Sequence, residues 1–136
     1  MLVAIVGAVL LALCLAVVIA VAKDKGPQPD DVAVSYEHAW DRLDFDALWT
    51  LSGAELRDGL DRKQFNAAKH AAYAERRELR GLAANIVVDD SIVRRDNAVV
   101  TTRVELRDGS VVHNAVQLVR RNSRWQVVAY AMVPAG

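Results

Sequence analysis

The chain has 136 residues, of which 53% are hydrophobic and 25% are charged, and its formal net charge is zero. This length accommodates one folded domain and a membrane anchor, and the lack of a basic stripe with interleaved aromatic residues argues against a nucleic-acid partner. A single Cys excludes an internal disulfide framework, three His give no metal-ligand cluster, and no motif predicts another cofactor.

The first 22 residues, Met1–Ala22, contain no charged side chain. At about 1.5 Å per residue, a helix of this length crosses a hydrocarbon core of about 30 Å, so we predict a single-pass transmembrane helix. A cleaved signal peptide is the alternative, but it normally has a basic start and a shorter apolar run. Lys23 and Lys25 flank only the carboxyl side, which mildly favours a cytoplasmic domain and leaves the side of the membrane open.

A linker over residues 23–30 separates this anchor from a domain over residues 31–136, because the run Gly26-Pro27-Gln28-Pro29 cannot extend a helix. Asp30 or Asp31 is placed to cap a first helix that runs to about Arg42. Its apolar residues fall on one face: Val32, Tyr36, Ala39, Trp40 and Leu43.

Two more helices are predicted before the sheet. Asp44 opens a short helix over residues 45–51, which ends at Ser52-Gly53. Asp61 and Gln64 have the spacing of a capping box for a third helix, which we expect to run to about Leu79. Gly81 stops that helix, and the residues that it is expected to bury are Phe65, Ala68, Ala72 and Tyr73.

The region 86–133 consists of runs of Val, Ile, Thr, Leu and aromatic residues between three turn sequences, which predicts an antiparallel meander of four strands. A three-residue loop with Gly109 left-handed matches the apolar faces of the second and third strands. It sets Val104 opposite Val112, Val100 opposite Val116 and Thr102 opposite Asn114. The same loop at residues 95–97 sets Ile92 opposite Val100 and Val88 opposite Val104, and the last turn sets Leu118 opposite Val127 and Val116 opposite Ala129.

These registers place a polar row, Asp90, Thr102 and Asn114, on the inner face of the sheet. One interpretation is a self-satisfied hydrogen-bond row, or Asp90 at a wet edge of the sheet, because buried polar groups are normally paired. The other is the polar floor of a ligand pocket beneath Tyr36, Trp40 and Tyr73, although core filling is the more frequent role of such aromatic residues.

The outer face of the predicted sheet is more apolar than a solvated face. An apolar patch on a soluble surface usually marks a contact, so we predict an interface here, with coverage by the chain's own loops as the alternative. The residues of this predicted interface are Val99, Thr101, Ala115, Val128, Tyr130 and Met132.

The order of helices followed by an antiparallel sheet predicts an α+β fold with three helices on one sheet face. It resembles the cystatin-like fold of the nuclear-transport-factor-two-like superfamily, which includes ketosteroid isomerase-like and polyketide cyclase-like enzymes. The matching segments are Tyr36 and Trp40, the run Asp44-Phe45-Asp46-Ala47-Leu48, and Arg124-Trp125-Gln126-Val127. The chain looks most like the membrane-tethered members found in actinobacteria.

The resemblance implies a conical pocket between sheet and helices, which in the family is catalytic, ligand-binding or filled. No catalytic constellation is visible, and Asp90 is the candidate base if the protein is an enzyme. We therefore expect a membrane-anchored, non-catalytic interaction module that forms a homodimer or binds another membrane or envelope protein through its outer sheet face. The alternative is a binder of a small hydrophobic ligand, or an isomerase- or cyclase-like enzyme.

Overall fold

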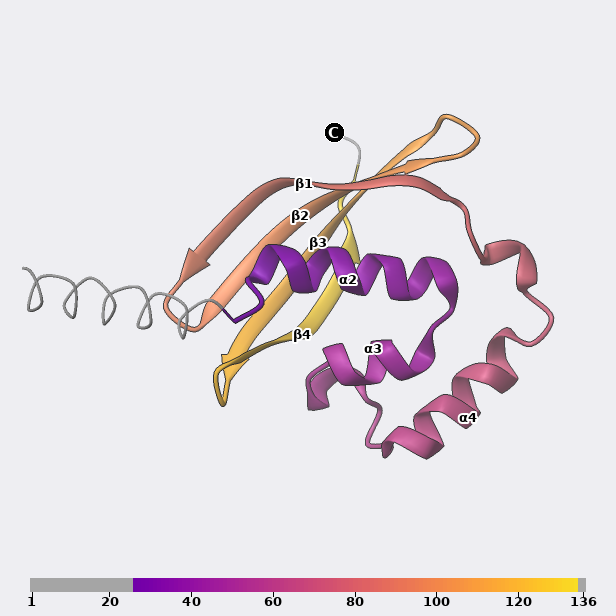
Figure 1. Ribbon diagram of the computed structural model, residues 1–136, viewed down its shortest axis with the longest axis horizontal. Coiled ribbons are helices and arrows are strands. Elements are labelled where there is room, and N and C mark those ends of the chain that lie inside the picture. Colours follow the sequence, from indigo (N-terminus) through magenta and orange to yellow (C-terminus); the bar gives the residue numbers. More distant parts are fainter. Residues whose placement is uncertain (1–25, 135–136) are drawn as a thin grey trace, which may run out of the picture.

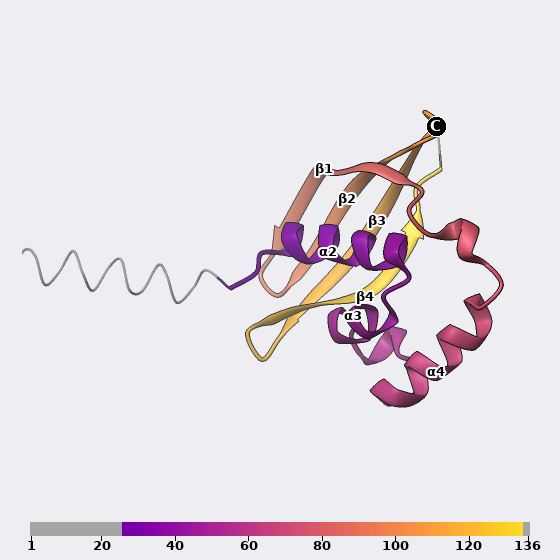
Figure 2. The same ribbon diagram turned by 45° about the vertical axis from the view of Figure 1, so that its right-hand side comes forward.

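The structure, a computed structural model, describes residues 26–134 of the chain (Figure 1). The predicted transmembrane helix at Met1–Ala22 lies outside the described residues. Among the residues that are described, no helix is long and apolar enough to cross a membrane. Helices come first and strands follow, and the helices cover one face of a single sheet (Figure 2). The predicted α+β class, with three α-helices on a four-stranded antiparallel sheet, is confirmed.

The sheet is a meander in which each strand pairs with the next one along the chain, in the order β1-β2-β3-β4. Its strands are β1 (Ala83–Arg94), β2 (Asn97–Leu106), β3 (Val111–Arg121) and β4 (Arg124–Met132). Sequential pairing of this kind needs only short turns, which the sequence supplies between all four strands.

The register between β2 and β3 is the predicted one. Val104 lies opposite Val112, and Thr102 lies opposite Asn114. Gly109 has a φ of 90°, a left-handed conformation that costs glycine little because it has no Cβ. This hairpin is therefore determined by local sequence: turn chemistry and the apolar pattern agree on one register.

The predicted registers of β1 and of the end of β4 are wrong, because each strand contains an irregularity. The β1–β2 turn has two residues, Arg95 and Asp96, and Val88 lies opposite Thr102 instead of Val104. The pairing then shifts at Asp89, so that Asp90 lies opposite Thr101. A tertiary contact accounts for the tighter turn, since the backbone oxygen of Asp96 accepts a 2.8 Å hydrogen bond from the Arg120 backbone N–H.

In β4 the pairing skips Val128, so that Tyr130 instead of Ala129 lies opposite Val116. A β-bulge of this kind turns the following side chains to the other face of the sheet. The bulge lies where Ser52 forms a parallel bridge with Val127, and where the Gly53 N–H donates a 2.7 Å hydrogen bond to the Val127 oxygen. The edge of β4 is thus partly covered by the chain itself.

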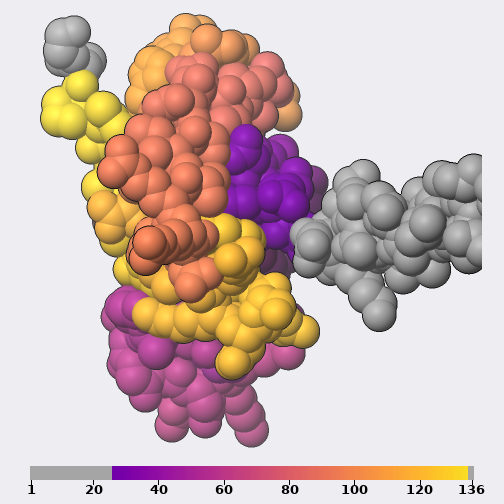
Figure 3. All heavy atoms as spheres, turned by 90° about the vertical axis from the view of Figure 1, so that its left-hand side faces the viewer, coloured from indigo at the N-terminus to yellow at the C-terminus, as the bar shows by residue number. Residues whose placement is uncertain are grey.

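The three hairpin turns are divided between the two ends of the sheet. The β1–β2 and β3–β4 turns lie near the start of α2 (Pro29–Arg42), and the β2–β3 turn lies at the opposite end (Figures 1 and 3). The first described residues, 26–29, therefore lie beside two hairpin turns.

Helix α2 lies across the inner face of the sheet (Figure 2). Its N-cap is Gln28, which forms a capping box with Asp31, and Pro29 occupies the first turn, where a missing N–H costs nothing. The helix begins slightly earlier than predicted and ends at Arg42, with Leu43, whose φ is 52°, as its C-cap. Its buried face contributes Val32, Ala33, Tyr36, Glu37 and Ala39.

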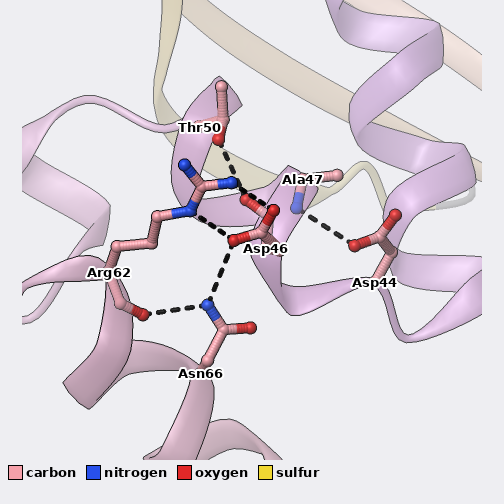
Figure 4. Close-up of polar contacts among 6 residues, drawn as sticks. All are labelled: Asp44, Asp46, Ala47, Thr50, Arg62 and Asn66. Carbon is pink, nitrogen blue, oxygen red and sulfur yellow. Dashed lines mark hydrogen bonds and ion pairs between the residues drawn. The ribbon is translucent and has the colours of Figure 1, made fainter.

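Helices α3 (Phe45–Leu51) and α4 (Arg62–Tyr73) are joined by the 3-10 turn η1 (Ala54–Leu56) and a short loop. Asp44 caps α3 through the Ala47 N–H at 3.1 Å, as predicted. The carboxylate of Asp46 binds the guanidinium of Arg62 through two hydrogen bonds and also accepts one from Asn66 at 3.4 Å (Figure 4). This exposed brace fixes the start of α4 against α3.

The predicted capping box of α4 is confirmed, since the side chains of Asp61 and Gln64 each accept a hydrogen bond from the backbone N–H of the other residue. The predicted end of α4 at Leu79 is wrong: the helix ends at Tyr73, and the separate 3-10 turn η2 (Arg77–Leu79) follows. Of the residues expected to be buried, Phe65 is buried and Tyr73 is half-buried, whereas Ala68 and Ala72 are exposed. Residues 74–78 are all exposed, so a longer helix would have had no apolar face to bury.

The hydrophobic core lies between α2, α3 and the inner face of the sheet. Val100, Val116 and Val127 have no exposed surface, and Leu48 and Leu118 are each 1% exposed. Burying a side chain of this size contributes about 1.5–3 kcal/mol. This core fills one part of the cone, and the candidate site lies beside it.

Candidate functional site

Glu37, on the face of α2 that covers the sheet, is a buried carboxylate with 5% of its surface exposed. Its Oε1 accepts hydrogen bonds from Thr102 Oγ1 at 2.7 Å and from Asn114 Nδ2 at 2.9 Å. Its Oε2 accepts one from the Tyr130 hydroxyl at 2.8 Å. Three strands and one helix thus bring their polar side chains to a single carboxylate, as burial of a charge requires.

The donors of this cluster also contact one another. Asn114 Nδ2 lies 2.9 Å from the Tyr130 hydroxyl oxygen, which accepts its hydrogen bond. Burial, and next the negative charge of Glu37, raise the pKa of Tyr130 above its usual value, so the phenol remains a proton donor. Tyr36 packs edge-to-face on the Tyr130 ring, with 5.2 Å between centroids, and burial raises its pKa as well.

A pocket of about 230 Å³ lies against this cluster, near the start of β1 and the β2–β3 turn. Glu37, Asn114 and Tyr130 provide its polar part, and apolar side chains from η2 and strands β1–β3 provide most of its wall. The lining residues are Glu37, Trp40, Asp41, Leu79, Leu82, Ala83, Ile86, Val104, Leu106, Val112, Asn114 and Tyr130. The site is therefore an apolar recess with a hydrogen-bonding floor, the usual composition of a small-molecule pocket.

Two residues of α2 shape the rim of this pocket. Asp41 holds the start of β1, because its Oδ1 accepts a 2.9 Å hydrogen bond from the Ala83 N–H and its backbone oxygen accepts one from the Gly81 N–H at 2.8 Å. The indole Nε1–H of Trp40 is buried and has no hydrogen-bond partner among the described residues.

The structure brings together some of the predicted site residues and separates another. Thr102 and Asn114 are neighbours in the buried cluster, and Trp40 lines the pocket. Tyr36 belongs to the core, and Tyr73 packs edge-to-face against Trp40 with centroids 5.9 Å apart, outside the pocket wall.

The placement of Asp90 in the inner polar row is wrong. Asp90 is exposed and pairs with Thr101, because the irregularity at Asp89 turns it away from Thr102. On the outer face, Asp89 lies 3.5 Å from Arg103 and 3.3 Å from His113. Asp90 therefore has no place in the inner pocket.

Sequence reasoning missed Glu37 and misplaced Tyr130. Glu37 has a signal in the sequence: it lies one helical turn after Ala33 and one before Trp40, on the side of α2 that should be apolar. A lone carboxylate there predicts a buried acceptor that needs donors. Tyr130 has no such local signal, because it faces inward only after the bulge at Val128.

The predicted outer interface is only partly on the outer face. Thr101 and Ala115 lie opposite each other, and Val99 is 39% exposed beside them. Tyr130 points inward, and Met132 pairs with the inward-facing Asn114. Val128 is half-buried, and a Cβ on Gly53 would lie 3.1 Å from its Cγ1, so part of this region is covered by the chain's own loop.

Among the described residues, no group of three or more His, Cys, Asp or Glu side chains is arranged to hold a metal ion. No family model and no curated protein matches the sequence.

Solved structures do match the fold. A protein from Campylobacter jejuni, named as an NTF2-like transpeptidase, superposes with a TM-score of 0.56 at 14% identity, over 74% of this chain and 96% of its own. A SEC-C motif containing protein from Rhodopseudomonas palustris superposes with a TM-score of 0.55 at 19% identity, over 79% of this chain and 80% of its own. The chain therefore has the NTF2-like fold, and its function must be argued from the site.

Proposed function

We propose that this chain is a membrane-anchored binding protein whose NTF2-like domain holds a small, mostly apolar molecule in the inner pocket. The observation that carries the proposal is the position of the Glu37 cluster at the polar side of an otherwise apolar recess. Apolar walls supply affinity, and a few fixed polar groups select orientation.

The size of the pocket limits the ligand. An apolar cavity of about 150 Å³ is large enough for benzene, so a pocket of about 230 Å³ fits one ring with a few additional atoms. Asn114 and Tyr130 provide hydrogen-bonding groups in the pocket wall. We therefore expect a monocyclic compound that carries a carbonyl or hydroxyl oxygen.

Binding is a better interpretation than proton-transfer catalysis. Each carboxylate in the pocket wall is already committed: Glu37 accepts three side-chain hydrogen bonds, and Asp41 accepts the Ala83 N–H. A general base must reach the proton that it removes, and these oxygens would first have to lose a protein donor.

The test uses the full chain in lipid nanodiscs, with cyclohexanone and acetophenone as probes and the side-chain amide of Asn114 observed by NMR. We expect saturable shifts in the wild type. Ala83→Phe, which places a ring in the pocket, should weaken binding by about tenfold or more. Ala84→Phe is the matched control, because Ala84 is the exposed neighbour outside the lining. Equal binding by the two variants would contradict the proposal.

Self-association through the outer sheet face is a second candidate function. Ile92 and Val99 lie directly opposite each other and are 52% and 39% exposed, next to the Thr101–Ala115 pair. Val99→Glu should weaken a dimer of the full chain by at least about tenfold in analytical ultracentrifugation. Val93→Glu is the control, because Val93 is 51% exposed and pairs with the buried Ala98 on the inner side of the sheet, and an equal effect would argue against the outer face.

The anchor itself is supported by the uncharged run Met1–Ala22. We expect the chain to remain with membranes after alkaline extraction. We also expect the domain to be protected from protease in intact cells, because Lys23 and Lys25 favour the cytoplasmic side. Release by alkali would contradict the anchor, and digestion in intact cells would contradict the orientation.

A further inference from the structure

Two hairpin turns and the first described residues surround one polar hollow at the end of the domain where the described chain begins. The hollow has a volume of about 530 Å³ and is lined by Gly26, Pro27, Gln28, Pro29, Val93, Arg95, Asp96, Arg120, Asn122, Ser123 and Trp125. Asp96 joins the two turns, since its Oδ1 accepts hydrogen bonds from Arg120 Nε at 3.0 Å and Nη2 at 2.8 Å. We call this end, comprising residues 94–97 and 120–125, the hairpin-tip surface.

The hairpin-tip surface carries unpaired positive charge. Arg94, Arg95 and Arg124 are exposed, and none of them forms an ion pair with another described residue. The neighbouring Arg120 and Arg121 are paired with Asp96 and Glu55, so they add no net charge. The surface therefore has an excess of three guanidinium groups, which match phosphate oxygens in shape and charge.

Two carboxylates at the start of α2 offset part of this positive charge, because their hydrogen bonds come from neutral donors and leave the carboxylates' charge in place. Asp31 accepts the Gln28 N–H in the capping box, and Asp30 Oδ1 accepts the Ser91 hydroxyl at 2.5 Å. Trp125 is half-buried at the same surface, with Arg120 5.5 Å from its ring centroid. Tryptophan beside arginine is typical of groups that lie at the headgroup level of a membrane.

The distance along the chain restricts the partner. From Ala22, the end of the proposed anchor, to Gly26 there are four residue steps, which span about 14 Å even when fully extended. The hairpin-tip surface lies beside Gly26, so it must remain close to the headgroups of the membrane that holds the anchor. We propose that the hairpin-tip surface docks on anionic lipid headgroups of that membrane, an inference that rests on the proposed anchor.

The test places the full chain in vesicles of phosphatidylcholine or of an equimolar mixture of phosphatidylcholine and phosphatidylglycerol. Hydrogen–deuterium exchange is measured over residues 94–97 and 121–125. We expect the anionic lipid to slow exchange at these residues by about tenfold, since each arginine near an anionic surface adds to the attraction. The protection should disappear in about 1 M salt, where the screening length falls to about 3 Å.

Two triple variants make the test specific. Arg94→Gln, Arg95→Gln and Arg124→Gln together should abolish the protection. The control combines Arg42→Gln, Arg77→Gln and Arg80→Gln, which removes the same charge from exposed arginines at the other end of α2 and from η2 and should preserve the protection. A loss of protection in both variants would reduce the effect to net charge and overturn the proposal.

The remaining outcomes separate docking from anchoring. If the chain stays with both kinds of vesicle in high salt but its turns exchange equally in both, the anchor stands and docking is wrong. If high salt releases the chain while low salt still gives lipid-dependent protection, the anchor is wrong and docking stands. If inorganic phosphate protects the turns equally without vesicles, the surface is a general anion site and the lipid proposal is overturned.

Discussion

Glu37 shows how much one buried carboxylate requires from its surroundings. Its oxygens receive hydrogen bonds from residues of β2, β3 and β4, so a helix and three strands must be in register for the charge to be tolerated. The cluster thereby couples the docking of α2 to the correct pairing of the sheet. It also defines the polar side of the pocket, so fold and site depend on the same atoms.

Replacing Glu37 should destabilise the domain more than replacing any one of its partners. Glu37→Leu leaves three buried donors without an acceptor, and we expect a loss of about 3 kcal/mol in the free energy of unfolding. Tyr130→Phe removes two hydrogen bonds, the one donated to Glu37 and the one accepted from Asn114, and should cost about 2 kcal/mol. Urea denaturation of the two single variants and the double variant measures the coupling. Asp90→Leu is the control for an exposed carboxylate, and a comparable loss there would contradict the inner role of Glu37.

The ion pair of Glu55 with Arg121 should make stability depend on acid pH. The hydrogen bonds from Arg121, at 2.7 and 2.8 Å, are the main cause that lowers the pKa of Glu55 from 4.5 to about 2. A lowered pKa gives stability that is present above about pH 4.5 and is lost as the pH falls toward about 2. Because the pair is exposed, the loss should be less than about 1 kcal/mol.

Urea midpoints at about pH 5 and about pH 2.5 measure this dependence. Arg121→Gln should reduce the difference between the two midpoints, whereas Arg124→Gln, which removes an arginine without an ion pair among the described residues, should leave it unchanged. The same difference in the wild type and the Arg121 variant would mean that other carboxylates cause the acid loss.

At the residue scale, the sequence predicts the site only in part. Thr102 and Asn114 were predictable because the β2–β3 register follows from a local turn and the apolar pattern. Glu37 was detectable as a charge on an apolar helix face. Asp90 was misplaced and Tyr130 was assigned to the wrong face, because each follows a shift in strand pairing that the neighbouring sequence does not predict.

The elements of this fold were predictable wherever their ends have local chemistry. The caps Asp44 and Asp61 and the left-handed Gly109 all hold the predicted positions. The tight β1–β2 turn and the bulge in β4 were not predictable, because they lie at contacts between residues distant in sequence. The pairing of Ser52 with Val127 and the hydrogen bond of Arg120 to Asp96 are the clearest examples.

Gly109→Ala tests the element whose register is local. With a φ of 90°, alanine at this position should cost about 1–2 kcal/mol, because its Cβ crowds the adjacent carbonyl. The loss should appear as faster hydrogen exchange of the residues flanking the β2–β3 turn. Ser110→Ala, at the adjacent exposed residue, is the control for loss of the short hydrogen bond to Asp108. A Gly109→Ala variant as stable as the wild type would contradict a turn fixed by glycine.

At the scale of the whole molecule, the order of elements was sufficient to predict the architecture. Three helices followed by four strands joined by short turns leave one simple arrangement, a meander covered on one face. The presence of a free pocket was not predictable, because the same aromatic residues can fill the cone or only part of it. Here Tyr36 joins the core and Trp40 borders the recess.

The described residues should form an autonomous folding unit. The core lies entirely within residues 32–127. The β1–β2 and β3–β4 turns are joined by the hydrogen bond from the Arg120 N–H to the Asp96 oxygen. A fragment of residues 26–136 should unfold in one cooperative transition, with a urea dependence of about 1–2 kcal/mol per molar. Its midpoint should equal that of the domain in the full chain. A lower midpoint would mean that residues 1–25 contribute to stability.

The pocket and the hairpin-tip surface lie at opposite ends of the same strands: one near the start of β1, the other near its end. Along β1, the pocket lining ends at Ile86 and the lining of the polar hollow begins at Val93, which places their facing walls roughly 23 Å apart. With the hairpin-tip surface held at the membrane, the mouth of the pocket is held well into the aqueous compartment. A ligand dissolved in the bilayer would have to leave it before capture. The protein is then suited to sampling water-borne solutes beside a membrane, and its occupancy should follow their aqueous concentration instead of their lipid solubility.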